Sequence, residues 1–345
     1  MRYLEDSFLS VGKLGDKSEN GGLYPPAEKK YPSQTASTDS AEGSRIFALD
    51  IGLSSTTKSP VSAGEIVELT RDGHIRTILK DQKMPDGLIV DPASCRMFWT
   101  CMGTPGKKDG AVYSADLDGS DVQIVVASGG TINTPKQLAL DPSSQTIYFC
   151  DREGSGVYRC KYDGSGLVKI IDNAQSGVDV QDVLSWCVGI AVAPSLGKLF
   201  WTQKGPSKGG KGRIFSAKIP SPGEACVEAK SVQTVLDKLS EPIDLEFDEE
   251  SGMLYWTDRG EIPSGNSLNR IRLDESGEVS AAGKASHEIL ARYFHEAIGL
   301  KLVPAEKAVY VTDLGGSIYR YDLESGKKTT LFTEEGRAFS GITVL

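Results

Sequence analysis

The stretch Leu254-Tyr255-Trp256-Thr257-Asp258 is a short aromatic strand ending in a carboxylate, and near-copies of it recur along the chain. The other copies are residues 46–50, 97–101, 147–151, 199–203 and 309–313. The last residues of the six copies, at 50, 101, 151, 203, 258 and 313, are 51, 50, 52, 55 and 55 residues apart. A nearly fixed period of about 50 residues indicates a repeat architecture.

The residues around each copy complete a unit of four strands. An apolar strand precedes the aromatic one, as at 87–91, and a strand that closes in an Asp-Gly turn follows it, as at 157–164. Asp-Gly between alternating strands is a strong hairpin signal, because glycine adopts a positive φ without steric strain. A fourth strand follows, as at 123–126. Four antiparallel strands in each repeat predict the blade of a β-propeller.

The first repeat begins at Arg45 with its aromatic strand and therefore lacks an innermost strand. Residues 341–345, Gly-Ile-Thr-Val-Leu, match that missing strand. We therefore predict an all-β, six-bladed propeller over residues 45–345, closed by the C-terminal strand completing the first blade. Closing the ring in this way removes exposed sheet edges. Residues 1–44 break the period with Gly, Pro and Ser/Thr-rich stretches and are predicted to form an extended N-terminal arm.

Composition argues against several classes of function. The net charge is −9, which disfavours nucleic acid and anionic membrane surfaces as partners. No apolar run reaches the ~18 residues of a membrane span. Glu5 and Asp6 lie where a secretory signal needs an apolar core, so a cytoplasmic location with reduced cysteines is expected. Three histidines argue against a multi-histidine metal site, and no phosphate-binding, dinucleotide-binding or serine-nucleophile motif is present, so no cofactor and no metal are expected.

The six aromatic strands resemble the YWTD family of six-bladed propellers, the repeat of low-density-lipoprotein-receptor ectodomains. The resemblance covers residues 45–345, and Leu254 to Asp258 is a full match to its motif. It implies the propeller fold. Receptor propellers are secreted and flanked by cysteine-rich modules that this sequence does not show, so receptor function is not implied with it.

One face of the predicted ring carries long connections, which follow the aromatic strands at 52–64, 102–110, 204–212 and 259–267. Turns on the opposite face, such as 92–95, are short. Binding sites usually lie on loops held by a rigid scaffold, so the channel mouth on the elaborated face is the predicted site.

Strand register assigns a mixed set of side chains to this mouth. The residues predicted to be catalytic, as donors to substrate oxygens or as a proton carrier, are Lys136, Gln203, Arg259 and His295. Those predicted to bind substrate are Met84, Asp86, Trp186, Glu241, Glu296 and Phe339. A solvated lysine and a structural histidine remain open for Lys136 and His295. Asp151, Asp258 and Asp313 are expected to cap neighbouring backbone and to bridge blades.

Three classes of function fit this mouth. The first is an enzyme of secondary metabolism that acts on small molecules without a cofactor. In length and plan the chain also resembles the fungal hetero-Diels–Alderases of tropolone sesquiterpenoid biosynthesis. That resemblance implies that a tropolone o-quinone methide is joined to a humulene-type olefin, mainly by positioning the two reactants and by hydrogen bonds to oxygen.

The second class is a protein-binding propeller that uses the same face. The third is a calcium-dependent, lactonase-like hydrolase with carboxylates such as Asp86, Glu241, Asp244 and Glu296 as ligands, although no Asn occupies an inner-strand start. Small molecules are the expected partners, and assembly into a homo-oligomer stays open.

Overall fold

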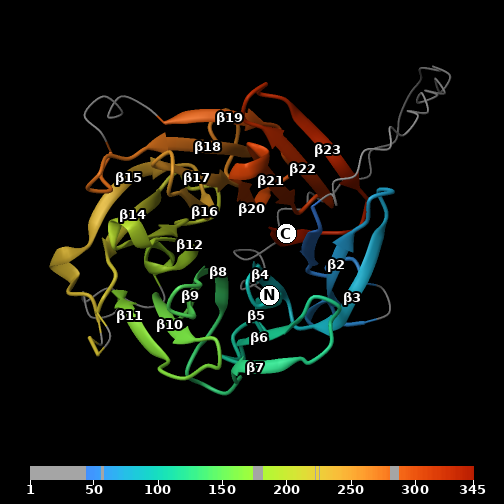
Figure 1. The fold of residues 1–345 in the computed structure, drawn as a ribbon, viewed down its shortest axis with the longest axis horizontal. Helices are drawn as coiled ribbons and strands as arrows, with labels where there is room; N and C mark the ends of the chain where they lie inside the picture. Colours follow the sequence, from blue (N-terminus) through green and yellow to red (C-terminus); the bar gives the residue numbers. More distant parts are fainter. Residues whose placement is uncertain (1–43, 56–57, 174–181, 222, 225, 280–286) are drawn as a thin grey trace, which may run out of the picture. The chain divides into compact units, whose positions relative to one another are not determined.

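In the computed structural model, the chain is described for residues 44–55, 58–173, 182–221, 223–224, 226–279 and 287–345. These residues form six four-stranded antiparallel sheets set around a central axis (Figure 1). The predicted six-bladed propeller is therefore confirmed. The predicted N-terminal arm, up to residue 43, lies outside the described residues.

The blades follow one another along the chain, and each runs from an inner strand to an outer strand. The first blade holds β24 (Phe339–Val344), β1 (Ile46–Asp50), β2 (Gly64–Leu69) and β3 (Ile75–Gln82), and the second holds β4 (Pro85–Asp91), β5 (Arg96–Cys101), β6 (Ala111–Asp116) and β7 (Gln123–Val126). The third holds β8 (Pro135–Asp141), β9 (Thr146–Asp151), β10 (Gly156–Lys161) and β11 (Val168–Asp172), and the fourth holds β12 (Cys187–Ala193), β13 (Lys198–Gln203), β14 (Gly212–Lys218) and β15 (Gln233–Leu239). The fifth holds β16 (Pro242–Asp248), β17 (Met253–Asp258), β18 (Ser267–Arg272) and β19 (Glu288–Arg292), and the sixth holds β20 (Ala297–Val303), β21 (Ala308–Asp313), β22 (Ser317–Asp322) and β23 (Lys328–Thr333).

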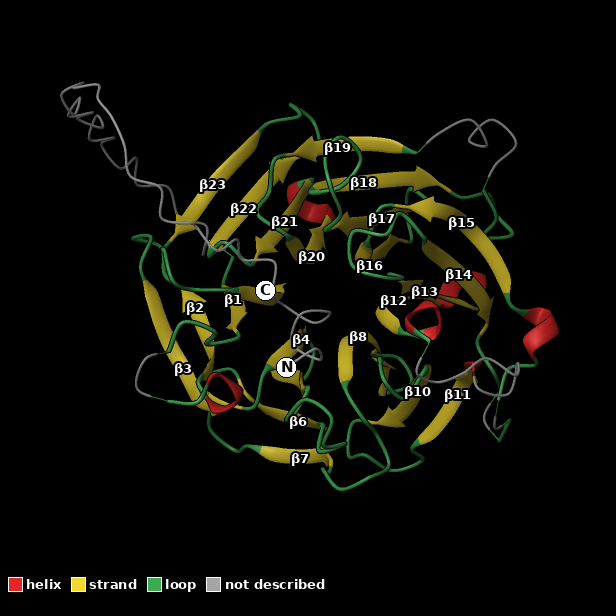
Figure 2. Ribbon diagram, turned by 180° about the vertical axis from the view of Figure 1, so that it is seen from behind, coloured by secondary structure: helices red, strands yellow, loops and turns green. Residues whose placement is uncertain are grey.

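The helices among these residues are three-residue 3-10 turns, at Pro60–Ser62, Val183–Ser185, Pro194–Leu196, Ala229–Ser231 and Pro304–Glu306. No helix in the described part of the chain has the length and apolar character needed to cross a bilayer. Viewed from behind, the inner strands β4, β8, β12, β16 and β20 surround the axis (Figure 2).

The ring closes as the sequence predicts. Strand β24 pairs antiparallel with β1, with Ile46 opposite Val344. Beyond the strands, the Arg45 amide donates to the Leu345 carbonyl at 2.8 Å and the Leu345 amide donates back at 2.9 Å. The end of the chain thus supplies the innermost strand of the blade that begins the ring.

The aromatic strands hold the blades together. Trp99, Trp201 and Trp256 are fully buried, and each belongs to a core cluster that includes residues of a neighbouring blade. The threonine after each tryptophan bonds across to the next inner strand: Thr202 Oγ1, for example, donates to the Ile243 carbonyl at 2.7 Å. The motif therefore fixes one blade against the next.

The aspartates that end these strands cap backbone amides, as expected. Asp151 accepts from the Thr134 amide at 2.7 Å, Asp258 from the Glu241 amide at 2.9 Å, and Asp313 from the His295 amide at 2.9 Å. These caps tie the end of each aromatic strand to the residues leading into its own inner strand. The predicted capping by the three aspartates is confirmed, but each of these bonds lies within one blade and does not provide the predicted bridge between blades.

Small residues let the inner strands approach one another at the axis. A Cβ atom on Gly189 would lie only 1.9 Å from the Ile243 carbonyl oxygen of the next inner strand, and one on Gly341 would lie 2.6 Å from the Asp86 carbonyl oxygen. Residues of all six inner strands also line a cavity of about 250 Å³.

Candidate functional site

The channel mouth is built from the second residue of each inner strand. These six equivalent residues are Asp86, Lys136, Val188, Ile243, Ile298 and Ser340, and all are buried. Val188, Ile243 and Ile298 pack together in one apolar cluster. The ring of residues therefore has an apolar half, with its charged residues confined to the second and third blades.

Lys136 and Asp86 form a buried ion pair between these two blades. The Lys136 Nζ atom lies 2.5 Å from Asp86 Oδ1 and 3.1 Å from the Met102 sulfur. The Gln137 amide donates to the other Asp86 oxygen at 3.2 Å. Burial lowers the pKa of Lys136, while the Asp86 carboxylate opposes this shift.

A second buried ion cluster centres on Glu241, which is inaccessible to solvent. One of its oxygens accepts from Lys204 Nζ at 3.1 Å and from Arg259 Nη2 at 2.5 Å, and the other accepts from the Lys208 amide at 3.0 Å. Arg259 Nη1 also lies 3.8 Å from Glu296. Burial lowers the pKa of Lys204 to about 8 despite the Glu241 charge, and the two cations lower the pKa of Glu241 although burial opposes them.

Arg152 connects the two clusters electrostatically. Its guanidinium forms an ion pair with Glu153 and lies over the Trp186 ring, 5.3 Å from the ring centroid. Its positive charge lowers the pKa of both Lys136 and Lys204. The mouth therefore combines four buried cations with four carboxylates, from Asp86, Glu153, Glu241 and Glu296.

Seven of the predicted site residues belong to this region. Asp86, Lys136, Glu241, Arg259 and Glu296 take part in the ion pairs, and Trp186 supports Arg152. Met84 is buried, with φ of +50°, and its carbonyl accepts from the amide of Met102, the residue whose sulfur contacts Lys136.

Three predicted site residues lie apart from the ion clusters. The His295 side chain is 76% exposed, and its Nδ1 atom lies 3.9 Å from Asp313. Phe339 is fully buried in the core of its blade, where it packs edge-on against Phe332. Gln203 accepts from Arg213 at 2.8 Å and lines a separate cavity between blades. Strand alternation accounts for Gln203, because it shares one face of β13 with Trp201.

Sequence reasoning placed Arg152 and Lys204 just beyond the rim of the mouth without assigning them a role, and it did not single out Glu153. A signal was present, since the residue after the aromatic strand is Arg152, Lys204 and Arg259 in three consecutive blades. What the sequence lacked was their burial, which makes these cations part of the site.

Three of the four carboxylates predicted as calcium ligands are engaged by donors. Asp86 and Glu241 are paired with buried cations, and Asp244 accepts from the Leu245 and Leu300 amides at 2.9 and 3.0 Å. Burial raises the pKa of Asp244 well above its ordinary value. Within the described ranges, no group of three or more His, Cys, Asp or Glu side chains is arranged to hold a metal ion. All six cysteines have free thiols.

Two proteins similar to this chain over most of its length come from fungi. No protein-family model matches it. It is 45% identical over 349 residues to the 3-hydroxyacyl-CoA dehydrogenase-like protein LAM1 of Cochliobolus heterostrophus, an alignment covering 99% of this chain and 72% of that protein. It is 42% identical over 299 residues to a protein of Pyricularia oryzae named low-density lipoprotein receptor-related protein 1, covering 85% of this chain and 95% of that one.

Solved structures share the fold. A chain in the crystal structure of a nidogen/laminin complex matches with a TM-score of 0.64 at 19% identity, covering 88% of this chain and 98% of its own. TolB from Acinetobacter baumannii matches with a TM-score of 0.59 at 12% identity, covering 88% and 66%. These likenesses support the expected six-bladed propeller family, and they give no support to the hetero-Diels–Alderase resemblance.

Proposed function

The chain belongs to the family of the Cochliobolus heterostrophus and Pyricularia oryzae proteins just described, and we propose that it is an enzyme that acts on a small molecule at the channel mouth. The observation that carries this proposal is the buried cluster of Lys204, Glu241 and Arg259. Buried ion pairs are weak contributors to net stability, because removing the charges from water offsets their mutual attraction. The cluster therefore supports a role beyond stability, and we propose that its cations serve as fixed donors to a substrate.

The buried cations of the mouth offer fixed donors to a substrate oxygen and a group that can carry a proton. Arg259 and Lys136 are held in place by carboxylates and are preorganised to stabilise negative charge that develops on a substrate oxygen. Lys204, with a pKa of about 8, exchanges protons close to neutral pH. The apolar half of the mouth, with Trp186 close by, suits a hydrocarbon portion of the same substrate or of a second one.

In its finer form, the proposal is an intermolecular hetero-Diels–Alder reaction. A hydroxymethyl tropolone would lose the hydroxyl of its hydroxymethyl group as water. The departing oxygen would accept one proton, the tropolone hydroxyl would release one proton, and the o-quinone methide would result. Cycloaddition to a humulene-type olefin would then form one C–C and one C–O bond and release nothing. The mixed mouth supports this form, with Lys136 and Arg259 against the tropolone oxygens and Met84 and Trp186 against the terpene.

We do not extend the dehydrogenase-like name of the Cochliobolus relative to this chain. Nicotinamide-dependent dehydrogenation relies on a βαβ unit with a glycine-rich turn before a helix. The described residues form antiparallel strands and three-residue turns, with no such unit among them.

Protein binding is the second candidate, and an exposed patch on the mouth face favours it. Tyr293 is 71% exposed and Ile262 is 53% exposed, on loops that are joined by a 2.9 Å hydrogen bond from Arg292 to the Pro263 carbonyl. Exposed aromatic and aliphatic side chains held on rigid loops are typical of protein interfaces. The receptor-related name of the Pyricularia protein agrees with this alternative.

The experiment incubates the purified chain with both reactants and follows product and stereochemistry. Arg259→Met removes a buried donor, and we expect it to lower kcat about 100-fold or more. Arg272→Met is the matched control, because this exposed arginine bonds only the Ser251 carbonyl among the described residues. The same rate and stereochemistry as buffer alone would refute the reaction. A stoichiometric protein partner from the host, lost on Tyr293→Ser, would favour protein binding instead.

A further inference from the structure

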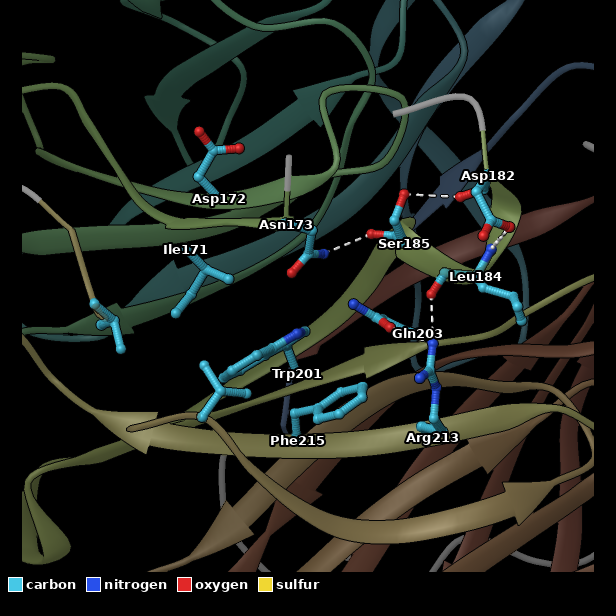
Figure 3. Close-up of a pocket in the computed structure, with 12 residues that line it drawn as sticks. Ile171, Asp172, Asn173, Asp182, Leu184, Ser185, Trp201, Gln203, Arg213 and Phe215 are labelled. Carbon is cyan, nitrogen blue, oxygen red and sulfur yellow. Dashed lines mark hydrogen bonds between the residues drawn. The ribbon is translucent and has the colours of Figure 1, made fainter. Parts of the chain in front are cut away.

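A second cavity, of about 310 Å³, lies between the third and fourth blades (Figure 3). The end of β11 and the turn before β12 form one side, and β13 and β14 form the other. The side chains that matter are Asp172, Asn173, Trp201, Gln203, Arg213 and Phe215. Its volume is within the ~300–1,000 Å³ range of small-molecule sites.

Two buried donors of this cavity lack an acceptor within the described part of the chain. They are the indole Nε1 of Trp201 and the Nε of Arg213. The guanidinium is otherwise fixed, since Nη2 donates to the Leu184 carbonyl at 2.6 Å and to Gln203 Oε1 at 2.8 Å. A buried donor left without a partner is destabilising, so such groups call for an explanation.

The second blade shows one way in which the same position is satisfied, whereas the Trp256 indole of the fifth blade, like that of Trp201, has no acceptor among the described residues. Trp99 stacks on Tyr113 at 5.6 Å and 23°, as Trp201 stacks on Phe215 at 5.6 Å and 23°. The Trp99 indole donates to Gln82 at 2.9 Å. Gln82 pairs with the first residue of β2, and its equivalent in the third blade is Asp172, which pairs with the first residue of β10.

Asp172 does not accept a hydrogen bond from the Trp201 indole as Gln82 does from the Trp99 indole. Its carboxylate lies 2.6 Å from the Lys169 ammonium, and the cavity lies beside the Trp201 indole where the second blade has an amide. Figure 3 shows the Trp201 nitrogen facing this space, toward Asn173 and Gln203. Between the third and fourth blades, the indole donor of Trp201 is therefore present, but the acceptor that Gln82 provides to Trp99 is absent among the described residues.

We propose that this cavity binds an uncharged, flat aromatic molecule whose carbonyl oxygen accepts from the Trp201 indole, with Arg213 Nε as a second donor. The ligand is expected to be uncharged because the charged side chains around the cavity balance one another. Asp172 is paired with Lys169, and the lining also holds one more carboxylate, Asp182, and one arginine, Arg213. The Trp201 and Phe215 rings give the ligand an aromatic wall, and Ile171, Val227 and Val232 add aliphatic contacts. This site is separate from the proposed reaction at the mouth.

The probe is acetophenone, with ethylbenzene as the analogue that lacks the oxygen. In a ¹H–¹⁵N spectrum of the whole chain, the four tryptophan indoles give four signals, and Trp201→Phe identifies one of them. We expect acetophenone to move the Trp201 indole proton downfield and saturably, ethylbenzene to produce no downfield shift, and the Trp99 signal to stay in place.

Affinity gives the second readout. Measured by equilibrium dialysis, Trp201→Phe should bind acetophenone about 5- to 10-fold more weakly, the value of one hydrogen bond, and the matched Trp99→Phe should bind as the native chain does. An unmoved Trp201 signal at the highest soluble acetophenone concentration, or unchanged affinity in Trp201→Phe, would overturn the proposal. Movement of the Trp186 signal alone would also overturn it, because the probe would then occupy the mouth.

Discussion

The ammonium nitrogen of Lys136 lies 2.5 Å from a carboxylate oxygen of Asp86, and the two residues come from the innermost strands of adjacent blades. Both side chains are almost fully buried. The pair therefore joins two blades at the axis and at the same time places a charged donor at the channel mouth.

Breaking this pair on one side leaves a buried charge without its partner. We expect Lys136→Met to lower the free energy of unfolding by about 3–5 kcal/mol, and Lys136→Met combined with Asp86→Asn to recover part of that loss. Urea denaturation measures both. The control is Lys301→Met, which breaks a partly exposed pair with Glu246 and should cost about 1 kcal/mol or less. Additive losses in the double variant would contradict the pairing.

The lowered pKa of Lys204 makes stability depend on pH. The folded chain holds this proton with a pKa of about 8, against an ordinary value of 10.5, so between about pH 8 and 10.5 the unfolded chain binds a proton that the folded chain does not. Stability contributed by Lys204 therefore rises with pH across that window and is flat below it.

We expect the native chain to gain stability relative to Lys204→Met as pH increases from about 8 to about 10.5. Unfolding free energies at four pH values, for both proteins, measure this. Lys307→Met serves as the control because Lys307 is exposed and its pKa is raised by its hydrogen bond to Glu324. Parallel curves for the native chain and Lys204→Met would show that Lys204 is not desolvated.

The two equivalent tryptophans should respond differently to the same substitution. Trp99→Phe breaks the bond to Gln82, whereas Trp201→Phe removes a donor that has no described partner. Both lose similar buried volume, so we expect Trp99→Phe to be the more destabilising by about 1 kcal/mol. Equal losses in chemical denaturation would mean that the Trp201 indole is satisfied in solution without a ligand.

Phe339 is buried and His295 is exposed, so we expect their substitution to affect the free energy of unfolding very differently. Phe339→Ala should reduce the free energy of unfolding by about 3–5 kcal/mol, because it opens a cavity in a closed core. His295→Ala should change it by no more than about 0.5 kcal/mol, because the side chain is exposed. A fall in kcat of about 100-fold or more in His295→Ala would instead restore the predicted proton carrier.

The fold was predictable because a propeller repeats its information. One aromatic strand can be misread, but six in register at 50 to 55 residues define blades, and the absence of one inner strand at Arg45 together with an unmatched one at 341–345 predicts the closure. The backbone caps of Asp151, Asp258 and Asp313 follow from the same repeat.

The site was predictable only in part, because register places a residue at a rim without fixing the direction of its side chain. Lys136 and Asp86 were assigned to the mouth, and they meet there as a buried pair. Phe339 begins its inner strand as Pro85 and Pro135 begin theirs, yet its large side chain turns into the blade core. The burial of Lys204 depends on residues distant in sequence, and no local pattern reports it.

The bonds between Arg45 and Leu345 also order events during synthesis. Five blades use residues that precede β24 in the chain, but the first blade must wait until β24 has been made. A chain that lacks β24 would present β1 with an unpaired edge, which is a template for aggregation. Loss of β24 would therefore leave the first blade with three strands and an open inner edge.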